Sequence, residues 1–509
     1  MHYRVGFPSL PVIALVVSTS VFQFGCASMQ SHDRLATEVQ ATSRVGGFPA
    51  AIAQLDATAT TVEDRAALLY NLERGELLRL NKQYAESTES FLKADAKVQT
   101  WEDAAKSNPT KLMGLVGASL VSERLAVYEG QDYEKVWLTT RLALNRLAQG
   151  DLDNARVDLK RTHEREAVIA EFRSSETLAA EEEAKKKGAT TGTKELNGYP
   201  VESLNDPEVT KLKNGYQNAL SHYLAGFVYE VLGETGLAAP GYRKAIELRP
   251  GMGVLEEGLR GLDGRTSFGQ KRAQKMTDVL FVIEAGNAPA RKPRGFTVPI
   301  PGRNGIKTVS ISYPVIDNSN DAPLGAISIG GKSFKLDNVV DVNVMARRAL
   351  KDAMPGMVVR SVIRAIAKSE MQEQLSKNGG MFGAIVGIVA AAATEGADDR
   401  MWRMLPGRVY LARGHVPAGL HRLDVDGRSA PVDVNIDGQY ALVALRIYDG
   451  VIIPSEVASF GRLAAAPATV GSDKPVAKKP SSPPAVKKPS KPVPEPVATT
   501  PKSSTPTKH

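Results

Sequence analysis

The stretch HYLAGFVYEVLGETGLAAPGYRKAIELRP, residues 222–250, decides how the first half of the chain folds. Its small, aromatic and proline residues stand at regular places, namely Gly226, Tyr229, Gly233, Ala238, Tyr242, Ala245 and Pro250. Small residues allow two antiparallel helices to approach, aromatic residues fill the space beside them, and a proline ends the second helix. We expect Gly226 and Ala238 to form the close contact of such a helix pair. Tyr229 and Tyr242 should fill the space beside it.

This spacing is typical of a tetratricopeptide repeat, and two weaker copies precede it. The first consists of Gly75, Leu78, Tyr84, Ser87, Phe91 and Ala94, and the second of Ala143, Gly150, Ala155 and Leu159. Gly75 and Ala143 lie 68 residues apart, which is two periods of 34, so a degenerate repeat is expected over residues 102–132. Residues 47–55 resemble a turn and second helix of an earlier repeat. Because at least three stacked repeats are needed for stability, we predict a solenoid of about five helix pairs within residues 26–270.

The second half, residues 276–460, changes to short strands with alternating apolar residues. The strand-like segments are Asp278–Glu284, Thr308–Tyr313, Arg408–Leu411, Leu420–Val425, Val432–Ile436 and Tyr440–Ile447, of which the last four are expected to form one antiparallel sheet. Ala326–Leu336 predicts a hairpin, because Gly330 and Gly331 supply the positive φ that a tight turn requires. Strands at intervals of about 8–12 residues suggest a sandwich-like, mainly antiparallel domain. The predicted fold class is therefore α+β, an all-α repeat domain followed by a β-rich domain.

A helical hairpin is predicted to interrupt these strands at residues 346–400. Val359, Val362, Ile363 and Ile366 are spaced as one stripe of a helix. The uncharged stretch Met381–Ala393 would form a helix of roughly 20 Å, shorter than the ~30 Å of a bilayer core. We therefore favour a buried core helix, with insertion of this segment into a membrane as the alternative.

Cys26, the single cysteine, ends an apolar stretch that begins after Arg4. A charged start, an apolar segment and a small residue before a cysteine resemble the lipoprotein signal, in which the thiol is acylated before cleavage. Residues 1–25 are accordingly predicted to be a signal peptide and Cys26 the site of lipid attachment, although Gln23 stands where Leu is usual. An uncleaved membrane anchor is the alternative, which two prolines in the apolar stretch disfavour.

The residues after the cysteine indicate a destination. Ala27 and Ser28 resemble the pattern of lipoproteins that travel to the outer membrane, so we expect a lipid-anchored protein on the periplasmic face of that membrane. Since the one cysteine would carry lipid, no internal disulfide is available and the fold must depend on its apolar core.

The tail, residues 461–509, is rich in Pro, Lys, Ser and Thr and is predicted to be disordered. From Val470 onward it holds eight lysines against Asp473 and Glu495, so six of the eight net positive charges lie there. A basic tail outside the cytoplasm suits anionic cell wall or lipopolysaccharide better than nucleic acid. A plain spacer is the alternative.

Three segments carry a resemblance to known proteins, namely Tyr128–Val136, Leu142–Asn145 and Ser221–Glu230. Together with the cysteine signal they resemble a poorly characterised family of tetratricopeptide lipoproteins of Gram-negative bacteria, up to about Glu456. Some members are encoded near lipoproteins that activate penicillin-binding proteins. The resemblance implies a periplasmic protein partner, with the cell-wall synthesis machinery as the first expectation, and it brings no catalytic residue with it.

The sequence contains no constellation typical of an enzyme. His163–Glu164 lacks the second histidine of a zinc-protease helix, and no nucleophile elbow, phosphate-binding loop or dinucleotide fingerprint occurs. His222 is expected to pack between helices, and His415 and His421 lack the Cys or carboxylate partners of a metal site. We therefore predict no catalytic residue, no cofactor and no metal.

The leading expectation is a non-enzymatic scaffold that presents a concave helical groove to a periplasmic protein, while lipid fixes one end of the chain. Direct binding of a glycan or lipid by the β-rich domain is the first alternative. An envelope hydrolase with an unrecognised site is the second.

Overall fold

The computed structural model describes residues 32–109, 127–187, 200–267, 275–302, 305–319, 322–358, 360–361, 397–426, 430–448 and 450–463. The signal peptide, Cys26, most of the expected degenerate repeat, the apolar segment Met381–Ala393 and the tail from residue 464 lie outside these residues. The expectations for those segments therefore stay predictions.

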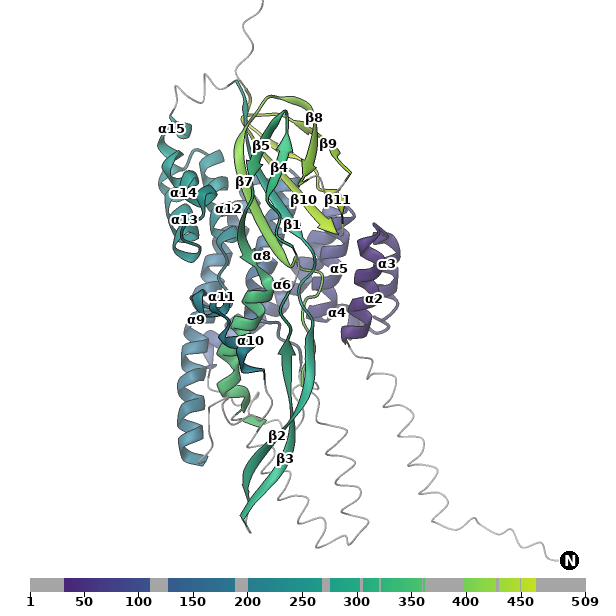
Figure 1. Ribbon diagram of the computed structural model, residues 1–509, viewed down its shortest axis with the longest axis vertical. Coiled ribbons are helices and arrows are strands. Elements are labelled where there is room, and N and C mark those ends of the chain that lie inside the picture. The colour runs from purple at the N-terminus through teal and green to yellow at the C-terminus, as the bar shows by residue number, and fades with distance from the viewer. Residues whose placement is uncertain are drawn as a thin grey trace, which may run out of the picture. The chain divides into compact units, whose positions relative to one another are not determined.

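The first half of the chain is helical, and its principal helices follow one another in pairs (Figure 1). They are α2 (His32–Arg44), α3 (Phe48–Asp56), α4 (Val62–Ala66), α5 (Leu68–Leu80), α6 (Tyr84–Ser107), α8 (Asp132–Ala148), α9 (Leu152–Lys187), α10 (Val201–Asn205), α11 (Pro207–Lys211), α12 (Ala219–Val231), α13 (Thr235–Leu248), α14 (Gly253–Arg260) and α15 (Leu262–Thr266). The pairs α5/α6, α8/α9 and α12/α13 hold the three sequence copies. Among the described residues, no helix combines the length and apolar character that crossing a membrane requires.

The turns of two pairs depend on glycine. Gly150 follows α8 with a φ of +76°, and Gly233 follows α12 with a φ of +81°, a conformation that costs glycine little and other residues more. The expected start of a degenerate repeat at residue 102 is wrong, because α6 continues without a break to Ser107. Its first helix would have to begin beyond that residue.

Two glycines on first helices lie against aromatic rings on second helices. A Cβ atom built on Gly226 would lie 2.7 Å from the ring of Tyr242, and one built on Gly75 would lie 2.5 Å from the ring of Phe91. Real Cβ atoms do not approach this closely, since a packed interior leaves no room for overlap. Both helix pairs therefore require glycine at this place.

The remaining predicted repeat residues occupy different environments. Ala94, Ala143, Ala155, Ala238 and Ala245 are fully buried, Tyr229 packs at the edge of the core, and Pro250 is exposed just after α13. Gly241 packs closely against Gly226, since a Cβ added to Gly241 would lie 2.7 Å from the Gly226 nitrogen. Gly241 therefore takes the role that the sequence assigned to Ala238, because only a residue without a side chain fits there.

Replacing Gly226 with alanine is expected to lower the free energy of unfolding by about 1–3 kcal/mol, because the new methyl group overlaps the Tyr242 ring. Urea denaturation measures this difference. Gly236→Ala in α13 is the matched control, since a Cβ there meets nothing within 4 Å. The control should be neutral or stabilising by up to about 1 kcal/mol. Equal effects of the two substitutions would contradict the close contact.

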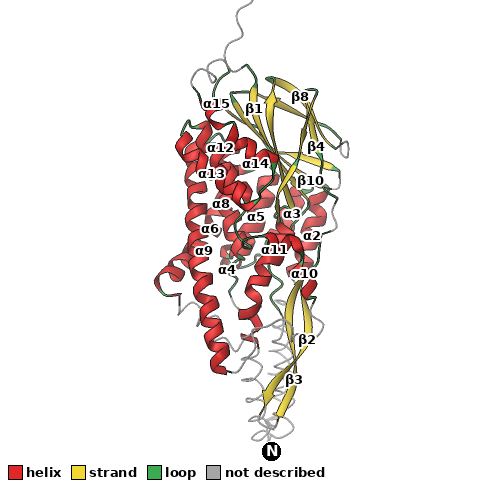
Figure 2. Ribbon diagram, turned by 60° about the vertical axis from the view of Figure 1, so that its left-hand side comes forward, coloured by secondary structure: helices red, strands yellow, loops and turns green. Residues whose placement is uncertain are grey.

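The second half forms two sheets and a separate ribbon (Figure 2). The strands are β1 (Thr277–Ala285), β2 (Arg291–Gly302), β3 (Gly305–Ile316), β4 (Ala326–Ile329), β5 (Lys332–Lys335), β6 (Asp337–Asp341), β7 (Arg408–Val416), β8 (Gly419–Val425), β9 (Val432–Ile436), β10 (Tyr440–Tyr448), β11 (Val451–Pro454) and β12 (Ala458–Phe460). One sheet has the order β11-β10-β1-β7-β6, with β12 also paired to β10, and the other has the order β5-β4-β8-β9. Strands β2 and β3 form a two-stranded ribbon. Residues 342–358 are helical, so the helix that we expected to begin at residue 346 begins at residue 342.

The predicted strands are present, but their pairing differs in part. The hairpin at Gly330 and Gly331 is confirmed, with β4 paired to β5 and φ values of +58° and +74°. The single antiparallel sheet expected for the last four strand segments is wrong, because β7 and β10 flank β1 while β8 and β9 belong to the other sheet. Strand β10 also runs parallel to β1. The long strand β2 was not expected, since it contains three prolines, which only strands with a free edge tolerate.

The six-stranded sheet is covered on both faces. Val279 and Phe281 of β1 belong to a core shared with Ile327 of the four-stranded sheet, so the two sheets form a sandwich. Leu280 and Val282, which point the other way, belong to a core shared with the helices of the first half. The expected domains 26–270 and 276–460 are therefore joined by one continuous core.

The inner helices α5, α8 and α12 lie between the outer helices and this sheet. Every residue of α8 from Tyr133 to Asn145 is buried, and a helix that is buried all round must lie between two layers. The outer helices α6, α9 and α13 supply one layer and the sheet supplies the other. The expectation of an open concave groove is therefore wrong for this chain, because its own sheet covers the inner helices.

Candidate functional site

Five charged side chains are buried where the inner helices meet the sheet, and we call them the junction cluster. Glu284 of β1 accepts hydrogen bonds from Arg79 Nη2 at 2.9 Å and from Arg446 Nη1 at 3.2 Å. It also pairs with Arg141 of α8. Glu76 of α5 lies 3.0 Å from Arg141 Nε and 3.4 Å from Arg446 Nη1. None of the five side chains is more than 4% exposed.

The junction cluster has more arginines than carboxyl groups, and these arginines keep Glu284 ionised. Burial alone would raise the pKa of the Glu284 carboxyl, but Arg141, Arg79 and Arg446 outweigh burial and hold that pKa well below its usual range. Three arginines face two carboxylates, and Arg446 further donates to the main-chain oxygens of Gly286 and Met404. Since an unpaired buried charge is costly, these contacts require the sheet and both helices to stay together.

A second buried group of charges connects α12 to the sheet. Glu230 of α12 lies 2.8 Å from Arg413 Nη2 of β7 and 2.7 Å from Arg265 Nε of α15, and it accepts the Tyr242 hydroxyl at 2.6 Å. Arg413 also lies 2.8 Å from Asp278 of β1. Burial would raise the pKa of Glu230, but the two arginines lower it to about 2. The inner face of the helices is thus joined to the sheet at two separate places.

The segment 397–407, which leads into β7, is held by two buried carboxylates. The Trp402 amide donates to Glu134 Oε1 at 2.7 Å. The Arg403 and Met404 amides donate to the two oxygens of Glu73 at 2.6 and 3.0 Å. Burial raises the pKa of Glu73 to about 8. The main chain of this segment therefore takes its position from α5 and α8.

His163 of α9 and His222 of α12 stack on each other. Their ring centroids lie 4.4 Å apart with an angle of 10° between the rings, and His222 Nε2 lies 3.1 Å from Glu166 Oε2. His222 therefore packs between helices, as expected. Burial and the neighbouring His222 lower the pKa of His163 to about 4.

His163 is expected to make stability depend on pH. The unfolded chain binds a proton on His163 near the ordinary pKa of 6.5, whereas the folded chain binds it only near 4. The stability linked to neutral His163 is therefore fully present above about pH 6.5 and lost as the pH falls toward 4. Between pH 6.5 and pH 4 the unfolding free energy of His163→Gln should fall by about 1–3 kcal/mol less than that of the wild type. Urea denaturation across this pH range measures the difference. His415→Gln, at an exposed site, should keep the wild-type profile, and a profile of His163→Gln that overlays the wild type would contradict the account.

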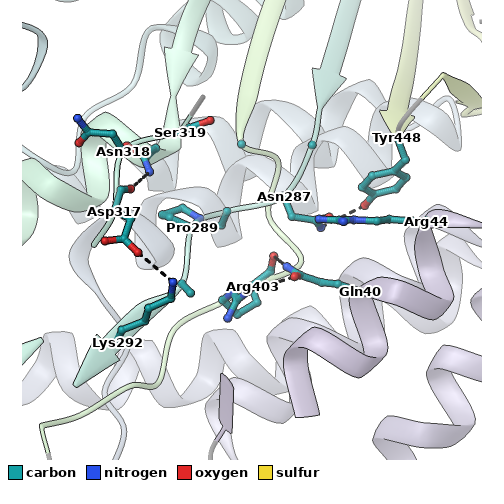
Figure 3. A pocket seen from close by; sticks show the side chains of 15 residues that line it. Gln40, Arg44, Asn287, Pro289, Lys292, Asp317, Asn318, Ser319, Arg403 and Tyr448 are labelled. Carbon is teal, nitrogen blue, oxygen red and sulfur yellow. Dashed lines mark hydrogen bonds and ion pairs between the residues drawn. The ribbon is translucent and has the colours of Figure 1, made fainter. Parts of the chain in front are cut away.

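A polar pocket of about 310 Å³ opens beside the 397–407 segment (Figure 3). Its walls come from α2, the turn after β1, the residues after β3, the start of the 342–358 helix and the end of β10. Gln40 and Arg403 hold each other there, because Gln40 Nε2 donates to the Arg403 main-chain oxygen at 2.7 Å and Arg403 Nη2 donates to Gln40 Oε1 at 3.1 Å. Arg403 also pairs with Asp33. The wall on this side is therefore fixed before any ligand enters.

The opposite side of the pocket carries a carboxylate and amides. Lys292 Nζ donates to Asp317 Oδ2 at 2.9 Å, and Asn343 Nδ2 donates to the Asp317 main-chain oxygen at 2.8 Å. Asn287 Nδ2 lies 3.4 Å from the Tyr448 hydroxyl. These groups can bind and orient a small polar compound.

Sequence reasoning missed both the charge clusters and the pocket. One signal was present, since Glu284 directly follows the apolar run Val279–Ile283 and Arg446 directly follows the run Tyr440–Leu445. A charged residue in such a strand predicts a buried partner, because an isolated buried charge is too costly. The partners Arg79 and Arg141 lie more than 140 residues away in the chain, and no local pattern identifies them.

The histidines discussed in the sequence analysis do not come together in one site. His421 Nε2 lies 2.7 Å from the Pro417 main-chain oxygen, and His415 is exposed on β7. In the part of the chain that the structure describes, no three His, Cys, Asp or Glu side chains are grouped as a metal would require. Neither protein-family models nor curated proteins nor solved structures yield a match to this chain.

Proposed function

We propose that the chain is a non-enzymatic scaffold of the bacterial cell envelope, attached by lipid at Cys26 to the outer membrane and facing the periplasm. The observation that supports this best is the joining of helices and sheet by two buried charge clusters across one continuous core. A body of this kind keeps its outer surfaces in fixed relation to one another. It can therefore hold a partner in a constant orientation.

We further propose that the helix pairs are tetratricopeptide repeats. Gly75 and Phe91 make the same contact as Gly226 and Tyr242, and in each pair the two residues are 16 apart in the chain. The recurrence of one contact at one spacing is what repeated units predict.

The proposed docking surface is the outer face of the helices. Repeat arrays commonly bind partners on their concave side, but here the sheet covers that side. The outer helices α6, α9 and α13 carry exposed large apolar side chains, among them Leu92 (43% exposed), Val157 (50%) and Leu237 (55%). Single exposed apolar residues are common on protein surfaces, so these three serve as probe positions rather than as a complete binding site. The resemblance makes a cell-wall synthesis protein the first expected partner.

Photo-crosslinking in living cells tests this proposal. A photoreactive amino acid replaces Leu92, Val157 or Leu237 in turn, with Leu420 on β8, which is 71% exposed, as the matched control. We expect one discrete envelope protein to be captured from positions on the outer helices and not from Leu420. Capture from Leu420 alone, or no discrete protein from any helix position, would contradict the scaffold. Deleting the repeats is a poor test here, because it would remove half of the shared core.

The anchor has its own test. The Cys26→Ala variant is expected to leave the membrane fraction and to lose the mass of the attached lipid. Unchanged membrane association and unchanged mass would contradict lipid attachment at Cys26.

A second candidate function is direct binding of an envelope compound by the β-rich half. The polar pocket is the specific observation in its favour.

A further inference from the structure

We propose that the polar pocket binds a small zwitterion of the amino-acid or short-peptide class, with its carboxylate at Arg44 and its ammonium group at Asp317. This site is separate from the proposed docking face on the outer helices. Its failure would leave the scaffold proposal unchanged, and failure of the scaffold would leave this site unchanged.

Arg44 provides the positive end of the pocket. It is the last residue of α2, it is exposed, and among the described residues it makes no hydrogen bond or ion pair. The other two cations of the wall are already engaged, Arg403 with Asp33 and Lys292 with Asp317. The excess positive charge of the pocket therefore belongs to Arg44. A guanidinium binds a carboxylate through two parallel hydrogen bonds, which makes a carboxylate the fitting group at this end.

Asp317 provides the negative end. Its Oδ2 accepts from Lys292 Nζ at 2.9 Å, while among the described residues its Oδ1 has one partner, an ion pair with Arg294 Nη2 at 4.0 Å, beyond hydrogen-bond distance. The Asp317 side chain is 52% exposed, so Oδ1 is open to a donor from the pocket. An ammonium group satisfies this acceptor, whereas a second anion at this end would be repelled.

The position of Asp317 is set by buried polar side chains. Asn343 donates to the Asp317 main-chain oxygen at 2.8 Å, and Arg347 Nε donates to Asn343 Oδ1 at 2.9 Å. Asn343 is 4% exposed and Arg347 is 3% exposed. This chain of contacts holds the loop after β3 without help from a ligand, and preorganisation of this kind lowers the cost of binding.

The two charged ends lie on opposite walls. Figure 3 shows Arg44 reaching in from α2 on one side and Asp317 on the other, with Pro289 and Asn287 between them. A volume of about 310 Å³ is at the small end of ligand pockets, which span roughly 300–1,000 Å³. A compound with opposite charges at its two ends and the size of an amino acid or dipeptide fits this arrangement. Compounds that carry only one of the two charges leave one wall unsatisfied.

Isothermal titration of the full-length protein tests the proposal with matched probes. Alanine and dialanine carry both charges, propionate lacks the ammonium group of alanine, and ethylamine lacks its carboxylate. We expect saturable binding of alanine or dialanine, and binding at least about tenfold weaker for propionate and ethylamine. Whichever of alanine and dialanine binds more tightly shows whether the pocket prefers a free amino acid or a peptide.

Two variants and one control complete the test. Arg44→Gln and Asp317→Asn are each expected to weaken alanine or dialanine binding by about ten- to a hundredfold while leaving the melting temperature unchanged. Arg34→Gln, on the same helix but outside the pocket, should bind as the wild type does. The absence of saturable binding up to millimolar concentrations, equal binding of propionate and alanine, or full binding by Arg44→Gln would each overturn the proposal.

Discussion

Replacing Glu284 with glutamine is expected to lower the free energy of unfolding by about 3–5 kcal/mol. The substitution removes the carboxylate that pairs with Arg79, Arg141 and Arg446 and leaves three buried guanidinium groups to share Glu76 alone. Because these groups are no more than 4% exposed, water cannot replace the lost partner. Urea denaturation followed by circular dichroism measures the loss.

The control for this prediction is Glu89→Gln on α6. Glu89 also pairs with a cation, Lys93 at 2.7 Å, but its side chain is 67% exposed. Water and salt screen an exposed pair of this kind, so the control should stay close to the wild type in stability. If Glu284→Gln lost as little as Glu89→Gln, the junction cluster could not be buried between helices and sheet.

Replacing Trp402 with alanine is expected to cost about 3–5 kcal/mol, because it leaves a large cavity in the core. Trp402 is fully buried, and its ring centroid lies 5.7 Å from that of Phe91 on α6. It belongs to the 397–407 segment, whose main chain is bound by Glu73 and Glu134. Loss of the indole therefore removes apolar contact between this segment and the helices.

Two further variants distinguish the effect of the cavity from other causes of lost stability. Trp402→Phe keeps most of the ring and removes an indole N–H that has no partner among the described residues, so its loss of stability should stay below about 1.5 kcal/mol. Leu420→Ala, at a side chain that is 71% exposed, should change stability by less than about 0.5 kcal/mol. An equal loss for Trp402→Phe and Trp402→Ala would show that packing volume is not the cause.

Local patterns predicted the elements of this fold well. The helix pairs around Gly75 and Gly226 and the Gly330–Gly331 hairpin follow from residues close together in the sequence, although the sequence paired Gly226 with Ala238 and not with the ring of Tyr242. In each case one residue type alone satisfies a local steric requirement, such as a positive φ or the absence of a side chain. Such requirements leave a visible mark in the sequence.

The assembly of those elements could not be predicted in the same way. Pairing of β1 with β10, and of Glu284 with Arg79 and Arg141, joins residues more than 140 positions apart. A strand that is apolar on both faces indicates that both faces are covered, but it does not identify the elements that cover them. The open groove was therefore a reasonable inference from the repeats alone, and the sheet that fills it could be recognised only in three dimensions.

The polar pocket could not be predicted from the sequence for the same reason. Arg44, Asp317 and Arg403 come from three distant parts of the chain, and none stands in a motif that marks a ligand. A charged residue at the end of a helix, such as Arg44, ordinarily indicates only a favourable interaction with the helix dipole.

The six-stranded sheet occupies the inner face of the helices α5, α8 and α12, and a double-mutant cycle between Arg141 on α8 and Glu284 on β1 tests this placement directly. Unfolding free energies are measured for the wild type, Arg141→Gln, Glu284→Gln and the double variant. The account predicts a coupling energy of about 0.5–3 kcal/mol, since the two side chains are in contact in a buried site. A coupling energy within about 0.3 kcal/mol of zero would mean that the two residues do not meet, and the inner face of the helices would then be open to a partner.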